Sequence, residues 1–497
     1  MKIRNELLSQ VRSYAGHTPH AAEDTLDCSL GVNPYGFPPV VKEAFAAFDP
    51  ERFYHYPHSD APQKAIVDYW ADYAFIEPEN IVLTDGSVSA LYLLCNILAK
   101  KGAEVVGFLP TFTDMVEYSR MMAMRYVGIP ARREENWRME VSDLVDAISG
   151  DTSLVYIDRP NNPTGQTLSL ADISRVLDRC EELGVYAIVD EAYGDFLPRE
   201  ESAVTLGPKY KNIIIVRTFS KGFGLAGLRA GYIITGQELI RYISKVSNPY
   251  MMSELSRELA AAALSDRTYA DSHGPDFAAM KQALRGVCGK ELTMAVTDDR
   301  VPICLLQHRN PRADLQELLM AEGVLTCSGG EFEPLDRSSV RLRVPRAEEL
   351  EYADLLLHVI DSSNLQWRQQ ADTVDRLIRE LGADTIPCIR VYNKSDLSFP
   401  GDRAKEEDAV AISAKTGEGI PDLLALIDKK LDKGTKRVTL HLPYDKAGAL
   451  DSLYREAKVE SVEYAATVDV VAVCNPRLLG QLKDYIEGWQ PPKEEWE

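Results

Sequence analysis

Three residues whose side chains can act together follow separate apolar stretches of the chain. Lys221 comes after the apolar residues 213–216, Asp190 comes after residues 186–189, and Asn162 lies in a turn-forming run at 161–165. A lysine amine can form a Schiff base with the aldehyde of pyridoxal 5'-phosphate (PLP). A carboxylate can keep the pyridine nitrogen of that cofactor protonated, so that the ring accepts electrons. The order and spacing of the three residues, more than any one of them, indicate PLP chemistry.

These residues need a scaffold that brings the ends of strands together. Apolar strands alternate with amphipathic helices, and the expected strands are residues 81–84, 105–109, 154–157, 186–189, 213–216 and 231–234. Near-continuous apolar strands separated by helices indicate a sheet that is covered on both faces. Gly86, Pro110, Asn162, Asp190 and Lys221 follow the carboxyl ends of these strands, where an open α/β sheet binds its ligand. The pattern therefore predicts an α/β fold with a large doubly wound domain.

The chain has 497 residues, which is too long for one hydrophobic core. The changes of pattern predict an N-terminal arm (1–45), a PLP-binding large domain (46–255), a small α+β domain (256–346), a partial Rossmann-like domain (347–435) and a small C-terminal α/β domain (436–497). A helix is expected to begin within 347–353. The last helix of the small domain is then either truncated or supplied by the segment that follows.

The motifs between Ser29 and Val344 together resemble the fold-type I PLP family of class I/II aminotransferases. The branch that contains histidinol-phosphate aminotransferase and threonine-phosphate decarboxylase is the most similar. The resemblance implies ping-pong transfer of an amino group between an amino acid and a 2-oxo acid. The cofactor residues that it implies are Gly86, Ser87, Val88, Phe112, Asn162, Asp190, Tyr193, Ser220, Lys221 and Arg229, with Tyr56 reaching the phosphate from the partner subunit of a homodimer.

The same resemblance implies a role for each of these residues. Lys221 is the Schiff-base lysine and the proton shuttle, and Asp190 pairs with the pyridinium nitrogen. Asn162 and Tyr193 hydrogen-bond the phenolic oxygen of the cofactor, and Phe112 stacks on its ring. The phosphate meets the backbone N–H groups of 86–88 at a helix N-terminus, together with the serine and arginine named above.

Two residues are expected on the substrate side. Arg341 is expected to pair bidentately with the substrate carboxylate, and Asn33 matches the substrate-side arm of the family. Histidinol-phosphate aminotransferases resemble one another in an arginine that binds the substrate phosphate, but the matching residues 323–327 contain none. This difference argues against a phosphorylated substrate. A decarboxylase of a phosphorylated amino acid shares every cofactor residue and stays open as an alternative.

Several of these motifs also have plainer interpretations. Taken alone, Phe112 could belong to the core, and Tyr56 and Arg341 could be structural. The glycines at 222, 224 and 227 match the dinucleotide pattern G-x-G-x-x-G, but that run opens with the lysine turn and lacks the βαβ setting and distal acid of the fingerprint.

The C-terminal third resembles the back half of an HflX-type ribosome-associated GTPase. The resemblance rests on the runs 354–361, 393–396 and 413–415 and on the closing segment that contains residues 440–444. It implies a degenerate guanine loop formed by Asn393, Lys394, Asp396 and Ser413. No G-x-x-x-x-G-K-[ST] occurs in the sequence, so the phosphate and magnesium half is missing. We expect a remnant without GTPase activity; an interaction protein that uses this tail on ribosomes is the non-enzyme alternative.

Composition limits the classes of protein that need to be considered. The net charge of -21 argues against a nucleic-acid binder. The expected location is the cytoplasm, because residues 1–6 do not resemble a secretory signal and no apolar run is long enough to cross a bilayer. Eight cysteines are scattered singly, with no zinc-type spacing, so no metal is expected.

Overall fold

The computed structural model describes residues 25–289, 291–346, 349, 355–364, 367–380, 386–397, 407–431, 436–443, 453, 457–464, 467–474 and 482–486. The chain divides into two compact units, Met1–Glu349 and Leu350–Glu497. The helix expected within 347–353 lies almost wholly outside the described residues. The finer domain boundaries given above stay predictions.

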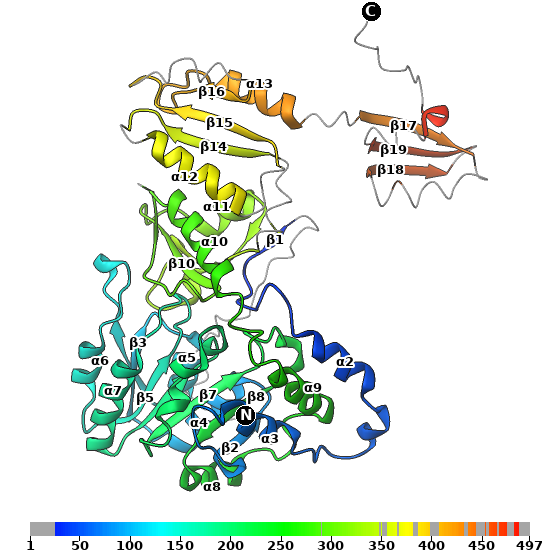
Figure 1. The fold of residues 1–497 in the computed structure, drawn as a ribbon. Helices are drawn as coiled ribbons and strands as arrows, with labels where there is room; N and C mark the ends of the chain where they lie inside the picture. The colour runs from blue at the N-terminus through cyan, green and yellow to red at the C-terminus, as the bar shows by residue number, and fades with distance from the viewer. Residues whose placement is uncertain are drawn as a thin grey trace, which may run out of the picture. The chain divides into compact units, whose positions relative to one another are not determined.

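A seven-stranded sheet forms the centre of the first unit (Figure 1). Its strands lie in the order β2 (Ile81–Thr84), β8 (Gly231–Thr235), β7 (Ile213–Thr218), β6 (Tyr186–Asp190), β5 (Thr152–Asp158), β3 (Glu104–Leu109) and β4 (Arg125–Pro130). The strands from β7 to β4 are parallel to one another, and β8 is antiparallel to both of its neighbours. The six expected strands are confirmed; β4, at the sheet edge, is an addition.

Alternate side chains of the sheet enter two different hydrophobic cores. Val105 packs with the helices on one face, whereas Val106 belongs to the core on the other, because successive side chains of a strand point to opposite faces. The first face is covered by α4 (Ser87–Leu98), α5 (Thr113–Met121) and α8 (Gln237–Val246). The second is covered by α3 (Ala61–Trp70), α6 (Val141–Ala147) and α7 (Leu170–Leu183). Near-continuous apolar strands are the expected result of this double burial.

Helix α7 shows how local sequence fixes the ends of these elements. The Ser169 side chain accepts a hydrogen bond from the backbone N–H of Asp172 at its start, and Gly184 ends it with a φ of 67°. A serine N-cap and a left-handed glycine are the usual solutions for the unpaired backbone groups at the two ends. The expected span from Leu170 to Leu183 is confirmed.

The rest of the first unit packs around this domain. Helices α2 (Pro39–Ala47) and α9 (Glu254–Ser265) pack on each other, and α9 also packs on α3. An antiparallel sheet follows, in the order β12 (Cys327–Ser328), β13 (Ser339–Arg343), β10 (Ile303–His308) and β9 (Leu292–Met294), with helices α10 (Gly274–Val287) and α11 (Leu315–Ala321). The short strand β1 (Leu26–Asp27) pairs in parallel with β11 (Val324–Leu325).

The second unit contains two three-stranded sheets. Strands β14 (Leu356–Asp361), β15 (Cys388–Asn393) and β16 (Ala409–Ala411) are parallel, and α12 (Trp367–Glu380) and α13 (Ile420–Leu431) accompany them. Strands β17 (Lys436–Leu442), β19 (Val468–Cys474) and β18 (Lys458–Tyr464) form an antiparallel sheet. The strands and helices from β14 to α13 follow the order expected from the sequence, whereas the Rossmann-like and C-terminal α/β domains stay predictions.

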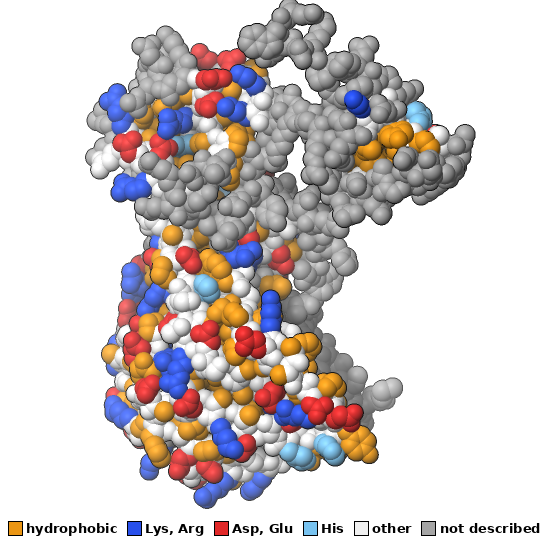
Figure 2. All heavy atoms as spheres, turned by 45° about the vertical axis from the view of Figure 1, so that its right-hand side comes forward, with side chains coloured by type: hydrophobic (Ala, Val, Ile, Leu, Met, Phe, Trp, Pro, Cys, Tyr) orange, Lys and Arg blue, Asp and Glu red, His pale blue; other side chains and the backbone are white. Residues whose placement is uncertain are grey.

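The described surface carries both signs of charge. Lysine and arginine side chains alternate with aspartate and glutamate over the face drawn in Figure 2. None of the described helices is long and apolar enough to cross a membrane. Within the same described residues, no cluster of three or more histidine, cysteine, aspartate or glutamate side chains is arranged to hold a metal ion.

Candidate functional site

A cavity lies where the carboxyl ends of the central strands meet. Most of the predicted cofactor residues line it, although they come from widely separated parts of the chain. The lining residues are Ser87, Val88, Phe112, Asp158, Pro160, Asn162, Asp190, Ala192, Tyr193, Ser220, Lys221, Ala226 and Arg229. Strand–loop junctions of one sheet therefore bring together nearly the whole predicted set.

Lys221 lies in the turn that follows β7, and the N-terminal segment supports this turn. The backbone N–H of Asn33 donates to the Lys221 carbonyl at 3.0 Å, and its side-chain amide donates to the Gly222 carbonyl at 2.9 Å. Burial lowers the pKa of Lys221 to about 8, with help from the positive charges of Arg341 and Arg229. A substantial fraction of the amine is thus neutral, and therefore nucleophilic, near physiological pH.

Asp190 ends β6 and lines the same cavity. One carboxylate oxygen accepts from the backbone N–H of Ala192 at 3.1 Å, and the other accepts from the Tyr156 hydroxyl at 3.0 Å. Burial raises the pKa of Asp190 to about 7, and the neighbouring Asp158 carboxylate adds to the rise. A buried acid of this kind gains most from a cationic partner such as a pyridinium.

Asn162 and Tyr193 approach the cavity from two further loops. The Asn162 side-chain oxygen accepts from Arg341 at 3.1 Å, which connects the cavity to strand β13 of the small sheet. The Tyr193 hydroxyl lies against Gly31, where an added Cβ would come within 1.9 Å of it. A glycine at position 31 is therefore needed for the tyrosine to occupy its place.

The end of the cavity near Gly86, Ser220 and Arg229 is suited to an anion. Gly86 has a φ of 114° and precedes helix α4, whose first N–H groups have no partners within the helix. Arg229 lies close to it, since a Cβ on Gly86 would approach the Arg229 guanidinium to 2.6 Å. The Ser220 hydroxyl is 3.5 Å from the same guanidinium. A helix N-terminus, a hydroxyl and an arginine together match a phosphate group.

These features fit PLP in each of its parts. A neutral amine faces the space where an aldehyde would be held, a buried carboxylate matches the ring nitrogen, and an anion site lies at the helix N-terminus. The glycine at position 86 leaves room for a close approach to the backbone.

Four predicted residues lie outside the lining of this cavity, and one of them, Gly86, directly precedes the lining residue Ser87. Tyr56 is 69% exposed and stacks on Tyr250 with 4.5 Å between the ring centroids, so its expected role across a subunit boundary stays a prediction. Arg341 is buried and reaches the cavity through Asn162. Asn33 is buried beneath the lysine turn, and its proposed contact with substrate also stays a prediction.

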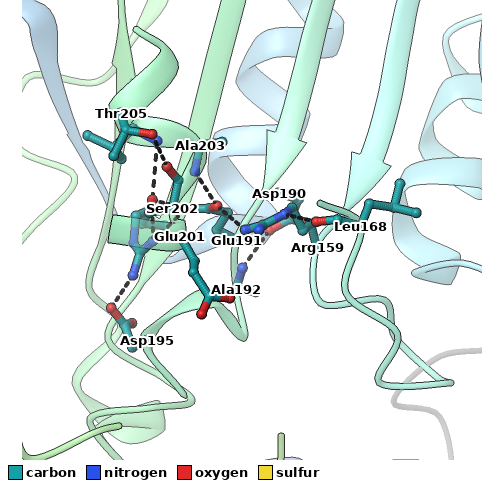
Figure 3. Close-up of polar contacts among 12 residues, drawn as sticks. Arg159, Leu168, Asp190, Glu191, Ala192, Asp195, Glu201, Ser202, Ala203 and Thr205 are labelled. Carbon is teal, nitrogen blue, oxygen red and sulfur yellow. Dashed lines mark hydrogen bonds and ion pairs between the residues drawn. The ribbon is translucent and has the colours of Figure 1, made fainter. Parts of the chain in front are cut away.

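A buried ionic cluster around Glu191 was not predicted from the sequence (Figure 3). Glu191 accepts from Arg159 at 3.0 Å, from Arg217 and the Ser202 hydroxyl at 2.5 Å, and from the backbone N–H of residue 203 at 2.8 Å. Arg217 also pairs with Asp195. Burial alone would raise the pKa of Glu191, but Arg217 and Arg159 outweigh it and hold that pKa below its ordinary value.

The cluster follows from the alternation of side chains at strand ends. Asp190 lines the cavity, whereas the next residue, Glu191, enters the cluster; Asp158 and Arg159 divide in the same way. The sequence signal that marks these positions is a pair of charged residues directly after an apolar strand. Their partners at 202 and 217 are distant in sequence, and no local spacing points to them.

The comparisons with known proteins agree with this geometry. The family model for aminotransferases of class I and II matches residues 23–354. A histidinol-phosphate aminotransferase of Dehalococcoides mccartyi (strain CBDB1) is 32% identical over 258 residues, which are 50% of this chain and 69% of that protein.

Two solved structures share the fold. The histidinol-phosphate aminotransferase of Sinorhizobium meliloti in complex with pyridoxal-5'-phosphate has a TM-score of 0.55 at 22% identity, covering 72% of this chain and 91% of that one. The L-threonine-O-3-phosphate decarboxylase of Porphyromonas gingivalis has a TM-score of 0.55 at 20% identity, covering 66% and 97%. The family match, reaching across the whole cavity and the buried lysine within it, shows that the chain belongs to the class I and II aminotransferases and is a PLP-dependent aminotransferase.

Proposed function

We propose that the enzyme transfers an amino group between an amino acid and a 2-oxo acid, with Lys221 as its reactive lysine. The observation that carries this proposal is the shared cavity, in which the amine of Lys221 has its pKa lowered to about 8 and the carboxyl of Asp190 has its pKa raised to about 7. Bound PLP supplies an aldehyde for the amine and a ring that accepts electrons. The chain supplies the groups that hold the cofactor and move protons.

The proposed roles rest on the family resemblance and on the place of each residue at the cavity. Lys221 is the base that moves a proton at the substrate carbon, because its amine is buried and partly neutral. Asp190 holds the ring nitrogen in its protonated form. Asn162 and Tyr193 hold the ring oxygen, and Phe112 packs on the ring. Ser220, Arg229 and the start of α4 hold the phosphate.

Arg341 is proposed to bind the substrate carboxylate. Its guanidinium is buried and already oriented by Asn162 and by the carbonyl of Ser29. A planar guanidinium that is held by neighbours binds a carboxylate with less loss of side-chain entropy. Because residues 323–327 lack the arginine expected for a substrate phosphate, a substrate without a phosphate group is favoured.

We further propose a homodimer that shares its active sites. An exposed group of aromatic side chains supports it: Phe53, Tyr54 and Tyr56 are 59%, 87% and 69% exposed. Large exposed aromatics of this kind often mark a protein–protein interface. Mixing Lys221→Ala chains with inactive Tyr56→Ala chains should restore some activity in heterodimers, whereas a fully active monomer in sedimentation would refute the dimer.

For the second unit we propose an HflX-like remnant that neither hydrolyses GTP nor binds it tightly. Two contacts support its guanine-side geometry: the Ser413 hydroxyl donates to Asp396 at 2.7 Å, and the backbone N–H of Ala414 donates to the Asn393 side chain at 3.0 Å. Lys394 is paired with Asp361. No phosphate-binding glycine loop occurs in the sequence to complete a nucleotide site.

The test of the main proposal is a spectrum followed by a substrate screen. Purified protein mixed with PLP should develop a visible absorbance band that disappears in Lys221→Ala. Amino donors and 2-oxo acids are then screened in pairs, and the products are identified. Release of carbon dioxide in place of a new amino acid would establish a decarboxylase; a visible band that survives Lys221→Ala would refute the proposed role of the lysine.

A further inference from the structure

Asp158, the last residue of β5, accepts four hydrogen bonds at the edge of the cavity. It lines the cavity and is only 5% exposed. One of its oxygens accepts from the Thr111 hydroxyl and from the Asn161 amide, both at 2.9 Å. The other accepts from the backbone N–H groups of Phe112 at 3.2 Å and Asn162 at 2.9 Å.

These four donors belong to two different loops. Thr111 and Phe112 lie in the loop after β3, and Asn161 and Asn162 lie in the turn after β5. The first loop carries the ring that is proposed to pack on the cofactor, and the second carries the amide proposed to hold the ring oxygen. One carboxylate thus fixes the relative positions of two groups that must meet one small ligand.

A neighbour on the same strand extends this arrangement to the ring nitrogen. Tyr156 lies two residues before Asp158, so both side chains project from the same face of β5, and the Tyr156 hydroxyl donates to Asp190 at 3.0 Å. The end of β5 therefore contacts the three residues proposed to hold the ring face, the ring oxygen and the ring nitrogen of the cofactor: Phe112, Asn162 and Asp190.

We propose that Asp158 is a positioning residue, which fixes Phe112 and Asn162 relative to each other on the two loops that hold the cofactor ring. The inference rests on the proposed roles of those two residues. It adds a function for a side chain that acts through its hydrogen bonds to these two loops.

The chemistry of the contacts explains why a carboxylate is needed. Four donors converge on two oxygens, and an ionised carboxylate accepts on both of them. An asparagine keeps one accepting oxygen and turns an NH₂ group toward the other pair of donors. Burial raises the pKa of Asp158 to about 6, while the bonds from Asn162, Asn161 and Thr111 oppose the rise. The carboxylate is therefore mostly ionised at the pH where the amine of Lys221 becomes neutral.

The first test measures the two loops without cofactor. In the full-length protein, Asp158→Asn should speed amide hydrogen exchange at least about tenfold in peptides that cover residues 110–113 and 160–165, because buried donors lose their acceptor. Asp178→Asn is the matched control: Asp178 accepts from Tyr210 at 2.7 Å, away from the cavity-lining residues. Unchanged exchange in both loops of Asp158→Asn would overturn the proposal.

The second test separates positioning from stability in the PLP-loaded protein. Asp158→Glu keeps the charge and both acceptors but moves them by one methylene, so it should fold, retain the visible band, change the visible circular dichroism of the bound cofactor and lower kcat at least about tenfold. Thr111→Val removes one donor and leaves both backbone bonds, and it should change kcat less than threefold. If Asp158→Glu shows the dichroism and kcat of the wild type, the proposal is overturned. This outcome decides the matter even when Asp158→Asn does not fold. A missing visible band in the wild type would instead refute the proposed function, and the exchange measurement would still decide the role of Asp158.

Discussion

Removing the Glu191 carboxylate should destabilise the first unit far more than removing an exposed glutamate. Glu191 is completely buried and accepts four hydrogen bonds, two of them from buried guanidinium groups. Glu191→Ala leaves those charges without their acceptor, and breaking a buried ion pair in this way costs about 3–5 kcal/mol. For a domain of this size, a loss of about 4 kcal/mol lowers the Tm by roughly 5–10 °C.

The measurement is thermal or urea unfolding of the full chain followed by tryptophan fluorescence. Trp70 is a suitable reporter because its ring is buried beneath the Arg217 guanidinium, 4.9 Å from it. The control is Glu182→Ala, which breaks an exposed pair with Arg179 on helix α7 and should cost less than about 1 kcal/mol. Equal losses of stability in the two variants would refute the reasoning.

The pH dependence gives an independent check on Glu191. Its pKa in the folded protein is lowered from the ordinary value of 4.5, so the unfolded state binds the proton more readily. The stabilisation is therefore fully present above that ordinary value and is lost as the pH falls through the folded pKa. The difference in stability between wild type and Glu191→Gln should shrink in acid; a difference that grows as the pH falls from 6 to 4 would contradict this sign.

Three further outcomes are expected. Asp190→Asn should lower kcat, measured as turnover at saturating cofactor, about a hundredfold or more, while PLP affinity changes much less. Near-normal turnover would remove Asp190 from its role. The rate at which cofactor-free protein binds PLP should rise with pH through about 8 and then level off, because only the neutral Lys221 amine reacts; a stopped-flow rate that still climbs tenfold between pH 9 and 10 would show an unperturbed lysine. Calorimetry of the full chain with GTP and GDP should show no tight binding, and submicromolar, magnesium-dependent affinity would reveal a phosphate site and reinstate Asp396 as a guanine ligand.

The parts of the fold that the sequence predicted well are those set by local pattern. The strands that carry Asp190 and Lys221 are short apolar runs, each followed by its polar residue, and burial on both faces leaves a clear signal. Strand β4 was not predicted because it lies at the edge of the sheet, where most of its residues are half-buried or exposed.

The parts that were not predicted depend on partners distant in sequence. Asp158 was not predicted as a site residue, because its contact with Thr111 forms only when the loop 47 residues earlier folds back onto it. Glu191 was not predicted to belong to a buried ion pair, since its partner Arg217 lies 26 residues away. The two-residue strand β1 carries no periodicity, and only its pairing with β11 makes it a strand.

That pairing of β1 has a consequence for the order in which the enzyme can be assembled during synthesis. Leu26 and Asp27 pair with β11, Cys28 accepts a bond from the Arg343 backbone, and Asn33 supports the lysine turn. The ribosome makes the N-terminal partner of these contacts first, yet β11 and β13 follow roughly 300 residues later, a delay of about 15–60 s at typical rates of elongation. Throughout that interval the central sheet can form, but the segment that braces the lysine turn has no strand to dock on. A chain that stops before the small sheet therefore contains every proposed cofactor residue but lacks the strands that hold the segment bracing the lysine turn.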